Sequence, residues 1–174
     1  SHDAARVTLE PSGEVTVAIG TPSQGQGHRT VMAQIVADVV GAPVEEVVLV
    51  ANDTAATPIS IPGTRASRTA VVLGGAVLKA AAELRERILA IAGALLEADP
   101  GDLEVVDGGV ALRDAPSRTV TLAEIAAAAY FRPEVRAALA EPDLSVSAFH
   151  DPRATYANGC IVAIVEVDAE TGQV

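Results

Sequence analysis

Hydrophobic and polar residues alternate with the period of a β-strand near the start of the chain. The alternation covers Arg6 to Leu9 and then Val15 to Ile19. Between these segments lies Pro11-Ser12-Gly13, whose residue types favour a tight turn. The pattern predicts a β-hairpin in which one face of each strand is buried.

The next apolar positions follow the period of a helix. From Val31 to Val40 they recur at i, i+1, i+4 and i+5, which places them on one helical face. This helix is expected to begin near His28 and to end near Gly41, because glycine commonly follows the last helical residue. The valine-rich segment Val44 to Ala51 predicts a strand, and the polar segment Asn52 to Pro62 predicts a loop.

A long helix is predicted in the middle of the chain, beginning near Ser67 or Thr69 and running to about Ala98. Gly74-Gly75 and Gly93 weaken its interior by roughly 1 kcal/mol each relative to alanine. These glycines therefore indicate either close helix packing or a break.

A small hairpin is expected next, from Leu103 to Val106 and from Val110 to Leu112, with its turn at Asp107-Gly108-Gly109. After it, Thr121 and Glu124 have the spacing of a capping box, in which each residue satisfies a backbone donor near the other. This spacing predicts a helix from Thr121 to about Tyr130.

The last part of the chain is expected to be irregular from Arg132 to Pro152 and to form a strand from Tyr156 to Val167. The strand leads into the turn Asp168 to Gly172, which would normally be followed by a return strand. Because the sequence stops at Val174, we expect a single domain excised from a longer protein. Ser1-His2 has the character of a cloning remnant.

The predicted fold class is α+β. It consists of a mixed β-sheet with helices packed on it, in the order β-hairpin-α-β-α-β-hairpin-α-β. A chain of 174 residues, of which 49% are hydrophobic, is long enough to bury a core.

The net charge and the aromatic content argue against nucleic acid as a partner. The net charge is −11, from 23 acidic and 12 basic residues, so duplex nucleic acid would be repelled. Only Tyr130, Phe131, Phe149 and Tyr156 are aromatic, which leaves no stacking platform for single-stranded bases.

Cys160, the only cysteine, lies in an apolar segment and is expected to be a small buried residue. The longest uncharged stretch of the helical region, Thr69 to Leu78, is shorter than the roughly 20 residues of a membrane span. The short stretch favours a soluble protein, and the lone cysteine with the absence of a signal peptide favours the reducing cytoplasm.

The loop Gln24 to Thr30 joins a predicted strand to a predicted helix and is rich in glycine. Free N–H groups of the first helical turn, with the positive end of the helix dipole, suit an anion. Gln26 adds an amide that can donate and accept. The alternative is a simple glycine turn. The evidence for a nicotinamide dinucleotide site is weak, since Thr30 stands where the third glycine would be. The phosphate loop of nucleotide hydrolases is excluded, because its Gly-Lys-Ser/Thr sequence is absent.

A second loop, Gly63 to Thr69, also opens onto a helix. It holds three hydroxyl groups and two guanidinium groups within seven residues, which is a set suited to phosphate or diphosphate. The alternative is a capped helix start with two solvated arginines. Two such helix starts in one domain favour a single long phosphorylated ligand.

No catalytic arrangement can be assigned from spacing. The three histidines and the cysteine are scattered, so no metal site is predicted. His28 is a candidate base or cofactor contact, with a loop histidine bonded to backbone as the commoner alternative.

Four segments in this order resemble the large subunit of molybdenum hydroxylases, the family of xanthine dehydrogenase, aldehyde oxidase and aerobic carbon monoxide dehydrogenase. The segments are Gln24-Gly25-Gln26-Gly27-His28, Asn52-Asp53-Thr54 with Pro58, Gly63-Thr64-Arg65-Ala66-Ser67-Arg68-Thr69, and Tyr156-Ala157-Asn158-Gly159 leading to Val165-Glu166-Val167-Asp168 with Thr171-Gly172. The resemblance covers nearly the whole chain.

The resemblance implies a molybdopterin-binding region, commonly for the cytosine dinucleotide form in bacteria. It implies that Gln26 approaches the ligands of the molybdenum centre and that the second loop contacts pterin and phosphate groups. The residues assigned to the cofactor are Gly25, Gln26, Gly27, His28, Thr64, Arg65, Ala66, Ser67, Arg68 and Thr69. At Arg65-Ala66 the sequence departs from the bacterial pattern, in which an aromatic or small residue followed by glycine is frequent.

For the parent protein, the resemblance implies hydroxylation of an aldehyde, an N-heterocycle or carbon monoxide with oxygen derived from water. Electrons would leave through iron–sulfur clusters and FAD on partner subunits or domains, and the parent would be a dimer of heterotrimers. The general-base glutamate and the substrate loop are expected outside this chain, so Glu166 is not that base. Alone, the chain is expected to be inactive.

Two alternatives remain open at this stage. One is a non-catalytic interaction module that keeps the fold without the cofactor. The other is a self-standing nucleotide-binding protein, which would bind a cytidine nucleotide without any other segment.

Overall fold

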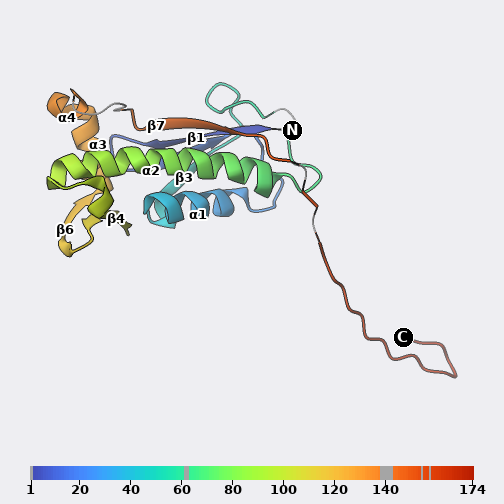
Figure 1. Ribbon diagram of the computed structural model, residues 1–174. Helices are drawn as coiled ribbons and strands as arrows, with labels where there is room; N and C mark the ends of the chain where they lie inside the picture. Colours follow the sequence, from blue (N-terminus) through green and yellow to red (C-terminus); the bar gives the residue numbers. More distant parts are fainter. Residues whose placement is uncertain (1, 61–62, 138–142, 154, 157) are drawn as a thin grey trace.

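The main layer of the molecule is a four-stranded mixed sheet with two helices side by side on one face (Figure 1). The computed structural model describes residues 2–60, 63–137, 143–153, 155–156 and 158–174. The strands of the sheet, in the order β3-β2-β1-β7, are β1 (Asp3–Leu9), β2 (Val15–Ile19), β3 (Val47–Val50) and β7 (Ser145–His150). The helices are α1 (His28–Val40) and α2 (Gly74–Leu96). The α+β class with a mixed sheet is confirmed.

The predicted hairpin forms as β1 and β2, which pair antiparallel with Val7 opposite Val17. Along β1, buried and half-buried residues alternate, so one face of the strand meets the helices. Strand β3 pairs parallel to β2, with α1 as the connection between them. The short 3-10 turn η1 (Val44–Glu46) occupies the first part of the segment that was predicted as strand.

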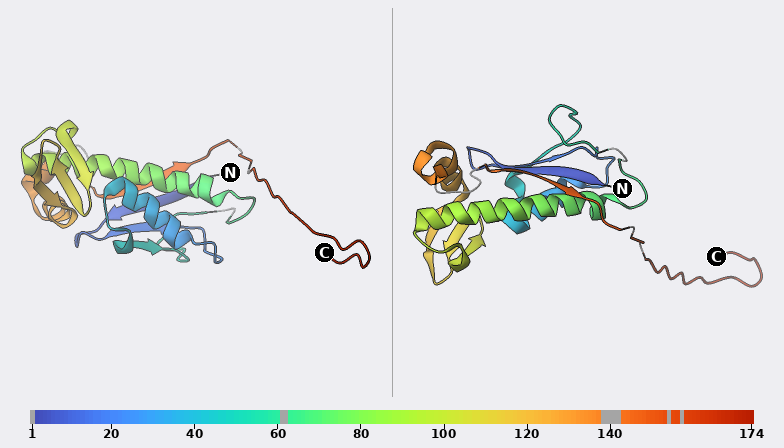
Figure 2. Two further views of the ribbon diagram at one scale, coloured as in Figure 1. Left: turned by 90° about the horizontal axis from the view of Figure 1, so that it is seen from below. Right: turned by 45° about the horizontal axis from the view of Figure 1, so that its top comes forward.

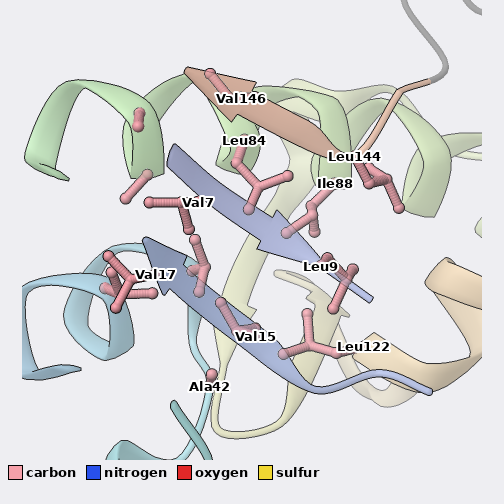
Figure 3. Packing of buried hydrophobic residues seen from close by; sticks show 14 of the residues in the cluster. Val7, Leu9, Val15, Val17, Ala42, Leu84, Ile88, Leu122, Leu144 and Val146 are labelled. Atoms are coloured by element: carbon pink, nitrogen blue, oxygen red, sulfur yellow. The ribbon is translucent and has the colours of Figure 1, made fainter. Parts of the chain in front are cut away.

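An aliphatic core fills the space between the sheet and the helices (Figure 3). Val7 and Leu9 from β1 and Leu84 and Ile88 from α2 are fully buried there. Helix α2 passes under β1 and β7 and then continues to the second part of the molecule.

The second part is a three-stranded antiparallel sheet with its own helix, at the far end of α2 (Figure 2). Its elements are the 3-10 turn η3 (Pro100–Asp102), β4 (Leu103–Val106), β5 (Gly109–Leu112), β6 (Ala115–Thr121) and α3 (Leu122–Phe131). A side chain at Gly41 would clash with Val105 and Val106 of β4. Gly41 therefore ends α1 and also leaves the space in which strand β4 of the second sheet packs.

The long helix is not broken at its glycines: the π-helical turn η2 (Thr69–Leu73) leads directly into α2, which is continuous from Gly74 through Gly93. The expectation of close packing at the glycines is confirmed. A side chain at Gly75 would collide with the ring of His150 on β7, and one at Gly93 would meet the carbonyl oxygen of Ala98.

One sequence-based expectation for the last part of the chain is wrong, and one strand that precedes it was missed. The segment expected to be irregular contains α4 (Pro133–Ala137) and strand β7. Strand β7 pairs antiparallel with β1, although the two strands lie near opposite ends of the sequence. Strand β6 was not predicted, and it turns the small hairpin into a three-stranded sheet. Ser1, Pro62 and Ala157 lie outside the described residues.

The expected strand from Tyr156 to Val167 has no ladder partner among the described residues. Residues 158–174 lead away from the folded body (Figures 1 and 2), and Ile161 and Ile164 are almost fully exposed. Cys160 is exposed as well, which corrects the expectation of burial. A β-pattern needs a neighbouring strand to become a strand, and here the pattern has none. The turn after it does form, since Asp168 accepts from the N–H groups of Glu170 and Thr171.

Among the described residues, no helix is long and apolar enough to cross a membrane.

Candidate functional site

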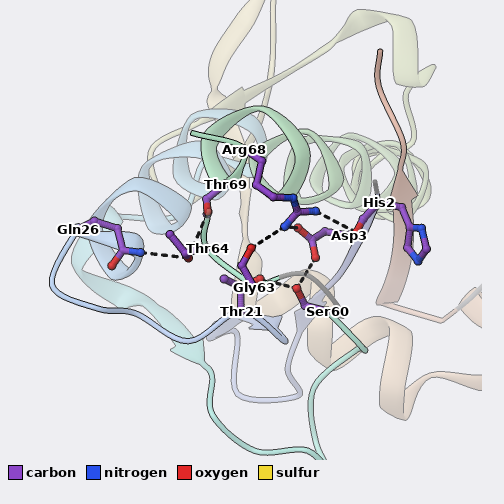
Figure 4. A network of polar contacts seen from close by, with 9 residues as sticks. All are labelled: His2, Asp3, Thr21, Gln26, Ser60, Gly63, Thr64, Arg68 and Thr69. Carbon is purple, nitrogen blue, oxygen red and sulfur yellow. Dashed lines mark hydrogen bonds and ion pairs between the residues drawn. The ribbon is translucent and has the colours of Figure 1, made fainter. Parts of the chain in front are cut away.

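The two glycine-containing loops predicted as anion sites lie against each other. The amide Nε2 of Gln26 donates to the hydroxyl of Thr64 at 3.1 Å (Figure 4). Gln26 is oriented within its own loop, because its Oε1 accepts from the N–H of Gln24 at 2.5 Å. The Thr69 hydroxyl also donates to Thr64, at 3.3 Å. Thr64 therefore accepts two hydrogen bonds and keeps its own hydroxyl proton for a further acceptor.

No side chain of the described residues caps the start of α1. Gly27 precedes the helix in the left-handed region, at φ 78° and ψ 26°, and no side chain caps the turn. The first N–H with a helical acceptor is that of Val31, which donates to Gly27 at 3.0 Å. In the described part of the chain, the N–H groups of His28, Arg29 and Thr30 have no acceptor. No acidic residue lies in this turn, so the positive end of the helix dipole is open.

The start of η2 is also uncapped, and its approach is strained. Ala66 and Ser67 have φ of 48° and 54°, a region that residues with a side chain rarely adopt. Such backbone outliers and π-helical turns both concentrate at functional sites. Ala66 and Ser67 are both exposed.

There is open space beside the glycines of both loops. A side chain added at Gly25, Gly27 or Gly63 would meet no described atom within 4 Å. All three have positive φ, so glycine is required by the backbone and not by crowding. A ligand can therefore approach the backbone of both loops closely.

The two arginines of the second loop have different environments. Arg65 is exposed, whereas Arg68 is buried and forms an ion pair with Asp3, from Nη1 to Oδ2 at 2.7 Å. Arg68 also donates to the carbonyl oxygen of Gly63 at 2.9 Å and to that of His2 at 3.0 Å. The two arginines were expected to act alike towards an anion, but the guanidinium of Arg68 holds the loop to β1 (Figure 4).

A buried polar network continues from Asp3, and it was missed in the sequence. Asp3 accepts from the hydroxyl of Ser60, which lies 2.6 Å from the hydroxyl of Thr21. Asp3 shares the inward face of β1 with Ala5 and Val7. In the sequence, Asp3 occupies a position of the strand alternation that is otherwise apolar. That pattern could have indicated a buried carboxylate, which needs a charged partner such as Arg68.

His28 is buried at the first position of α1, with 3% of its surface exposed. Neither ring nitrogen has a hydrogen-bond partner within the described residues, so the backbone-bonded alternative is wrong. Burial lowers the pKa of His28 below its usual 6.5, which favours the neutral ring at pH 7. A neutral imidazole can donate at one nitrogen and accept at the other.

Other candidate groups do not join the loops. The segment from Asn158 to Gly172, part of the family pattern, is exposed and leads away from them. Within the described ranges, no three or more histidine, cysteine, aspartate or glutamate side chains gather in a group that could hold a metal ion.

The whole chain, residues 1–174, matches the family model described as molybdopterin cofactor-binding domain. It is 37% identical over 172 residues to the nicotine 6-hydroxylase large subunit of Paenarthrobacter nicotinovorans, covering 98% of this chain. It is 33% identical over 171 residues to the carbon monoxide dehydrogenase large chain of Afipia carboxidovorans, again covering 98%. In both cases it spans only 21% of the relative.

Among solved structures, quinoline 2-oxidoreductase from Pseudomonas putida 86 superposes with a TM-score of 0.79 at 39% identity. The superposition covers 87% of this chain and 19% of that one. The sequence match and the structural match therefore both concern one portion of much longer proteins.

Proposed function

The chain belongs to the molybdopterin cofactor-binding domain family, and on this premise we propose that its two loops hold a molybdopterin in the full-length protein. The observation that carries the proposal is the hydrogen bond from Gln26 to Thr64, which joins two uncapped helix starts into one polar surface. The open space beside Gly25, Gly27 and Gly63 fits a group that lies against backbone.

Each part of the site has its own role in this proposal. The Gln26 amide, whose orientation is fixed by its hydrogen bond with the N–H of Gln24, would hold a polar group of the cofactor. The free N–H groups at the start of α1 and the hydroxyls of Thr64 and Ser67 bind its oxygen atoms. The neutral His28 ring, which has no hydrogen-bond partner among the described residues, has one donor and one acceptor available at the start of α1.

We further propose the cytosine dinucleotide form of the cofactor. Two separate helix starts, each with unsatisfied donors, suit a ligand that carries more than one phosphate group. The bound cofactor would supply a molybdenum redox centre for the oxidation of an electron-poor carbon with oxygen derived from water.

The proposed parent is the large subunit of a molybdenum hydroxylase that acts on an aldehyde, an N-heterocycle or carbon monoxide. An N-heterocycle is favoured, because nicotine and quinoline, which appear in the names of two relatives, are N-heterocycles. Iron–sulfur and FAD subunits or domains would be its partners, in a cytoplasmic dimer of heterotrimers. Turnover by the present chain alone is not expected, since it spans about a fifth of these relatives.

The test is the cofactor content of the full-length protein, purified with its partner subunits from cells supplied with molybdate. We expect about one molybdenum and one cytidine monophosphate released by acid hydrolysis per large subunit. Gln26→Ala and Ser67→Ala should each lower both values. A protein that contains no pterin would refute the proposal and favour an interaction module.

A further inference from the structure

The last part of the chain, residues 158–174, is an apolar arm that no described part of the molecule covers (Figures 1 and 2). Its large side chains up to residue 167 are between 56% and 97% exposed, and they are Ile161, Val162, Ile164, Val165 and Val167. Residues 159–165 include no charged residue. Exposed apolar segments rich in β-branched residues are prone to aggregate, so natural proteins cover them. A cover for the arm is therefore expected in the functional protein.

The arm is apolar on both of its faces in an extended conformation. The odd-numbered residues of 161–167 lie on one face and the even-numbered residues of 160–166 on the other, because successive side chains of a strand point in opposite directions. Both sets are apolar except for Glu166. In β1, by contrast, Arg6 and Thr8 alternate with buried residues and give that strand one polar face. A strand that lacks a polar face is typical of one that is buried on both sides.

The turn near the end of the arm has the hydrogen bonds of a hairpin. The N–H of Asp168 donates to the carbonyl oxygen of Gln173 at 2.9 Å, and the N–H of Gly172 donates to that of Asp168 at 2.8 Å. Gly172 has a φ of 71°, the left-handed conformation that closes such a loop. The next pair of this ladder joins Val167 to Val174, and every later pair joins the arm to residues that follow Val174.

We infer that the arm is one strand of a β-hairpin whose other strand directly follows Val174 in the full-length protein, and that the rest of the same polypeptide buries this hairpin on both faces. The matches to two relatives run through 98% of this chain but span only 21% of each relative, so most of such a polypeptide lies outside these residues. The hairpin would dock this domain onto the remainder of the large subunit. The inference rests on the proposed function only in taking the chain as part of a large subunit, and it requires no cofactor.

Cys160 is the only cysteine of the 174-residue chain, so its thiol reports whether the arm is covered. The 174-residue chain and the full-length protein are each treated with N-ethylmaleimide, and the modified peptide is quantified by mass spectrometry. We expect modification to be at least about hundredfold slower in the full-length protein, because a thiol in a covered hairpin reacts only after local opening. Full-length protein from cells grown without molybdate should show the same protection.

Substitutions on the two faces of the arm test the double burial. Ile161→Asp and Ile164→Asp place a charge on opposite faces. Both side chains are almost fully exposed in the 174-residue chain, so its midpoint of urea denaturation should not move. In the full-length protein, each change should lower the yield of soluble large subunit several-fold, because a buried charge is left without a partner.

The matched control is Glu170→Ala, at an exposed position of the turn, which should change neither the urea midpoint nor the yield. Ile161→Ala and Ile164→Ala are milder variants for the case in which the aspartate variants give no full-length protein. Each should speed the modification of Cys160 in the full-length protein about tenfold, since lost packing favours local opening.

Four results overturn the inference. Equal modification rates would show that the arm is uncovered in the full-length protein, and a loss confined to Ile161 or to Ile164 would show that only one face is buried. A shift in the urea midpoint of the 174-residue chain would show that the arm packs on this domain. A protected thiol in a 174-residue chain that sediments as a dimer would make a second copy the occupant. Full-length protein that contains no pterin but protects Cys160 would refute the proposed function and leave the inference standing.

Discussion

The start of α3 differs from the starts of α1 and η2 in how the free N–H groups of the first helical turn are satisfied. At α3, the hydroxyl of Thr121 accepts from the N–H of Glu124 at 3.2 Å, and the Glu124 carboxylate accepts from the N–H of Thr121 at 2.8 Å. The N–H of Leu122 donates to Gly108 at 2.9 Å. At α1 and η2, no side chain from the part of the chain that the structure describes caps the first turn.

The difference shows that the open helix starts are a specific property of the two loops. The same chain closes one helix with a complete capping box and leaves the first-turn donors of two others unsatisfied. Unsatisfied donors are costly unless water or a ligand satisfies them. Both open starts lie at one end of the main sheet, joined by Gln26 and Thr64, whereas the capped start belongs to the second sheet.

The largest loss of stability should follow from breaking the ion pair between Asp3 and Arg68, which holds the start of η2. Asp3→Ala removes the carboxylate that pairs with the buried guanidinium of Arg68, and we expect a loss of about 3–5 kcal/mol in the free energy of unfolding. Urea denaturation of the 174-residue chain measures it. The control is Glu83→Ala, which removes a more exposed pair with Arg87 and should cost about 0.2–1 kcal/mol. Equal losses in the two variants would mean that Arg68 does not anchor the loop.

Removing the cap of α3 should lower the stability of the fold without lowering the cofactor content of the full-length protein. Thr121→Ala is expected to lower the free energy of unfolding by about 1 kcal/mol, because an N-cap hydroxyl is lost. Molybdenum content of the full-length protein should stay at the level of the unsubstituted protein. A fall comparable to that in Gln26→Ala would show that the two kinds of helix start are not functionally distinct.

Giving α1 an acidic residue in its first turn should make it resemble α3. Thr30→Glu places a carboxylate near the free N–H groups, and we expect a gain of about 0.3–1 kcal/mol in the stability of the 174-residue chain. In the full-length protein the same change should reduce cofactor content, since the carboxylate competes with the ligand. Thr30→Gln, which has nearly the same shape without the charge, is the control and should retain more cofactor than Thr30→Glu.

The smallest effect concerns pH. Hydrogen bonds from the backbone and then the hydroxyl of Thr121 lower the pKa of Glu124 below its usual 4.5. The unfolded chain therefore binds this proton more readily, so the stabilisation is complete above pH 4.5 and is lost as pH falls through the folded pKa. Carbon-13 NMR should give a Glu124 midpoint below 4.5. In Glu124→Gln the corresponding fall in stability should be absent, and an unchanged pH profile would contradict the capping account.

Local signals in the sequence predicted the local structure well. The pair Thr121 and Glu124 predicted the capping box, and Gly41 predicted the end of α1. Both loops of the candidate site were also identified, because glycine, hydroxyl and amide groups at a helix start are visible in a short segment. These features depend on neighbours a few residues away.

What could not be predicted depends on distant partners. Strand β7 has a weaker β-pattern than residues 158–167, yet it forms because β1 provides its hydrogen bonds, with Ser145 opposite Thr8. In the same way, the inward direction of Arg68 is decided by Asp3, 65 residues earlier in the chain, and not by its own loop. The contact of Gln26 with Thr64 likewise follows only from the assembled sheet.

The most direct test of the central claim is hydrogen–deuterium exchange of the full-length protein, with cofactor and without it after growth without molybdate. The amides of residues 28–30 and 69–71 should exchange rapidly in the cofactor-free protein and become protected in the loaded protein. The amides of residues 122–124 at the capped start should show equal protection in both. Equal protection at all three helix starts, or a change confined to α3, would contradict the account.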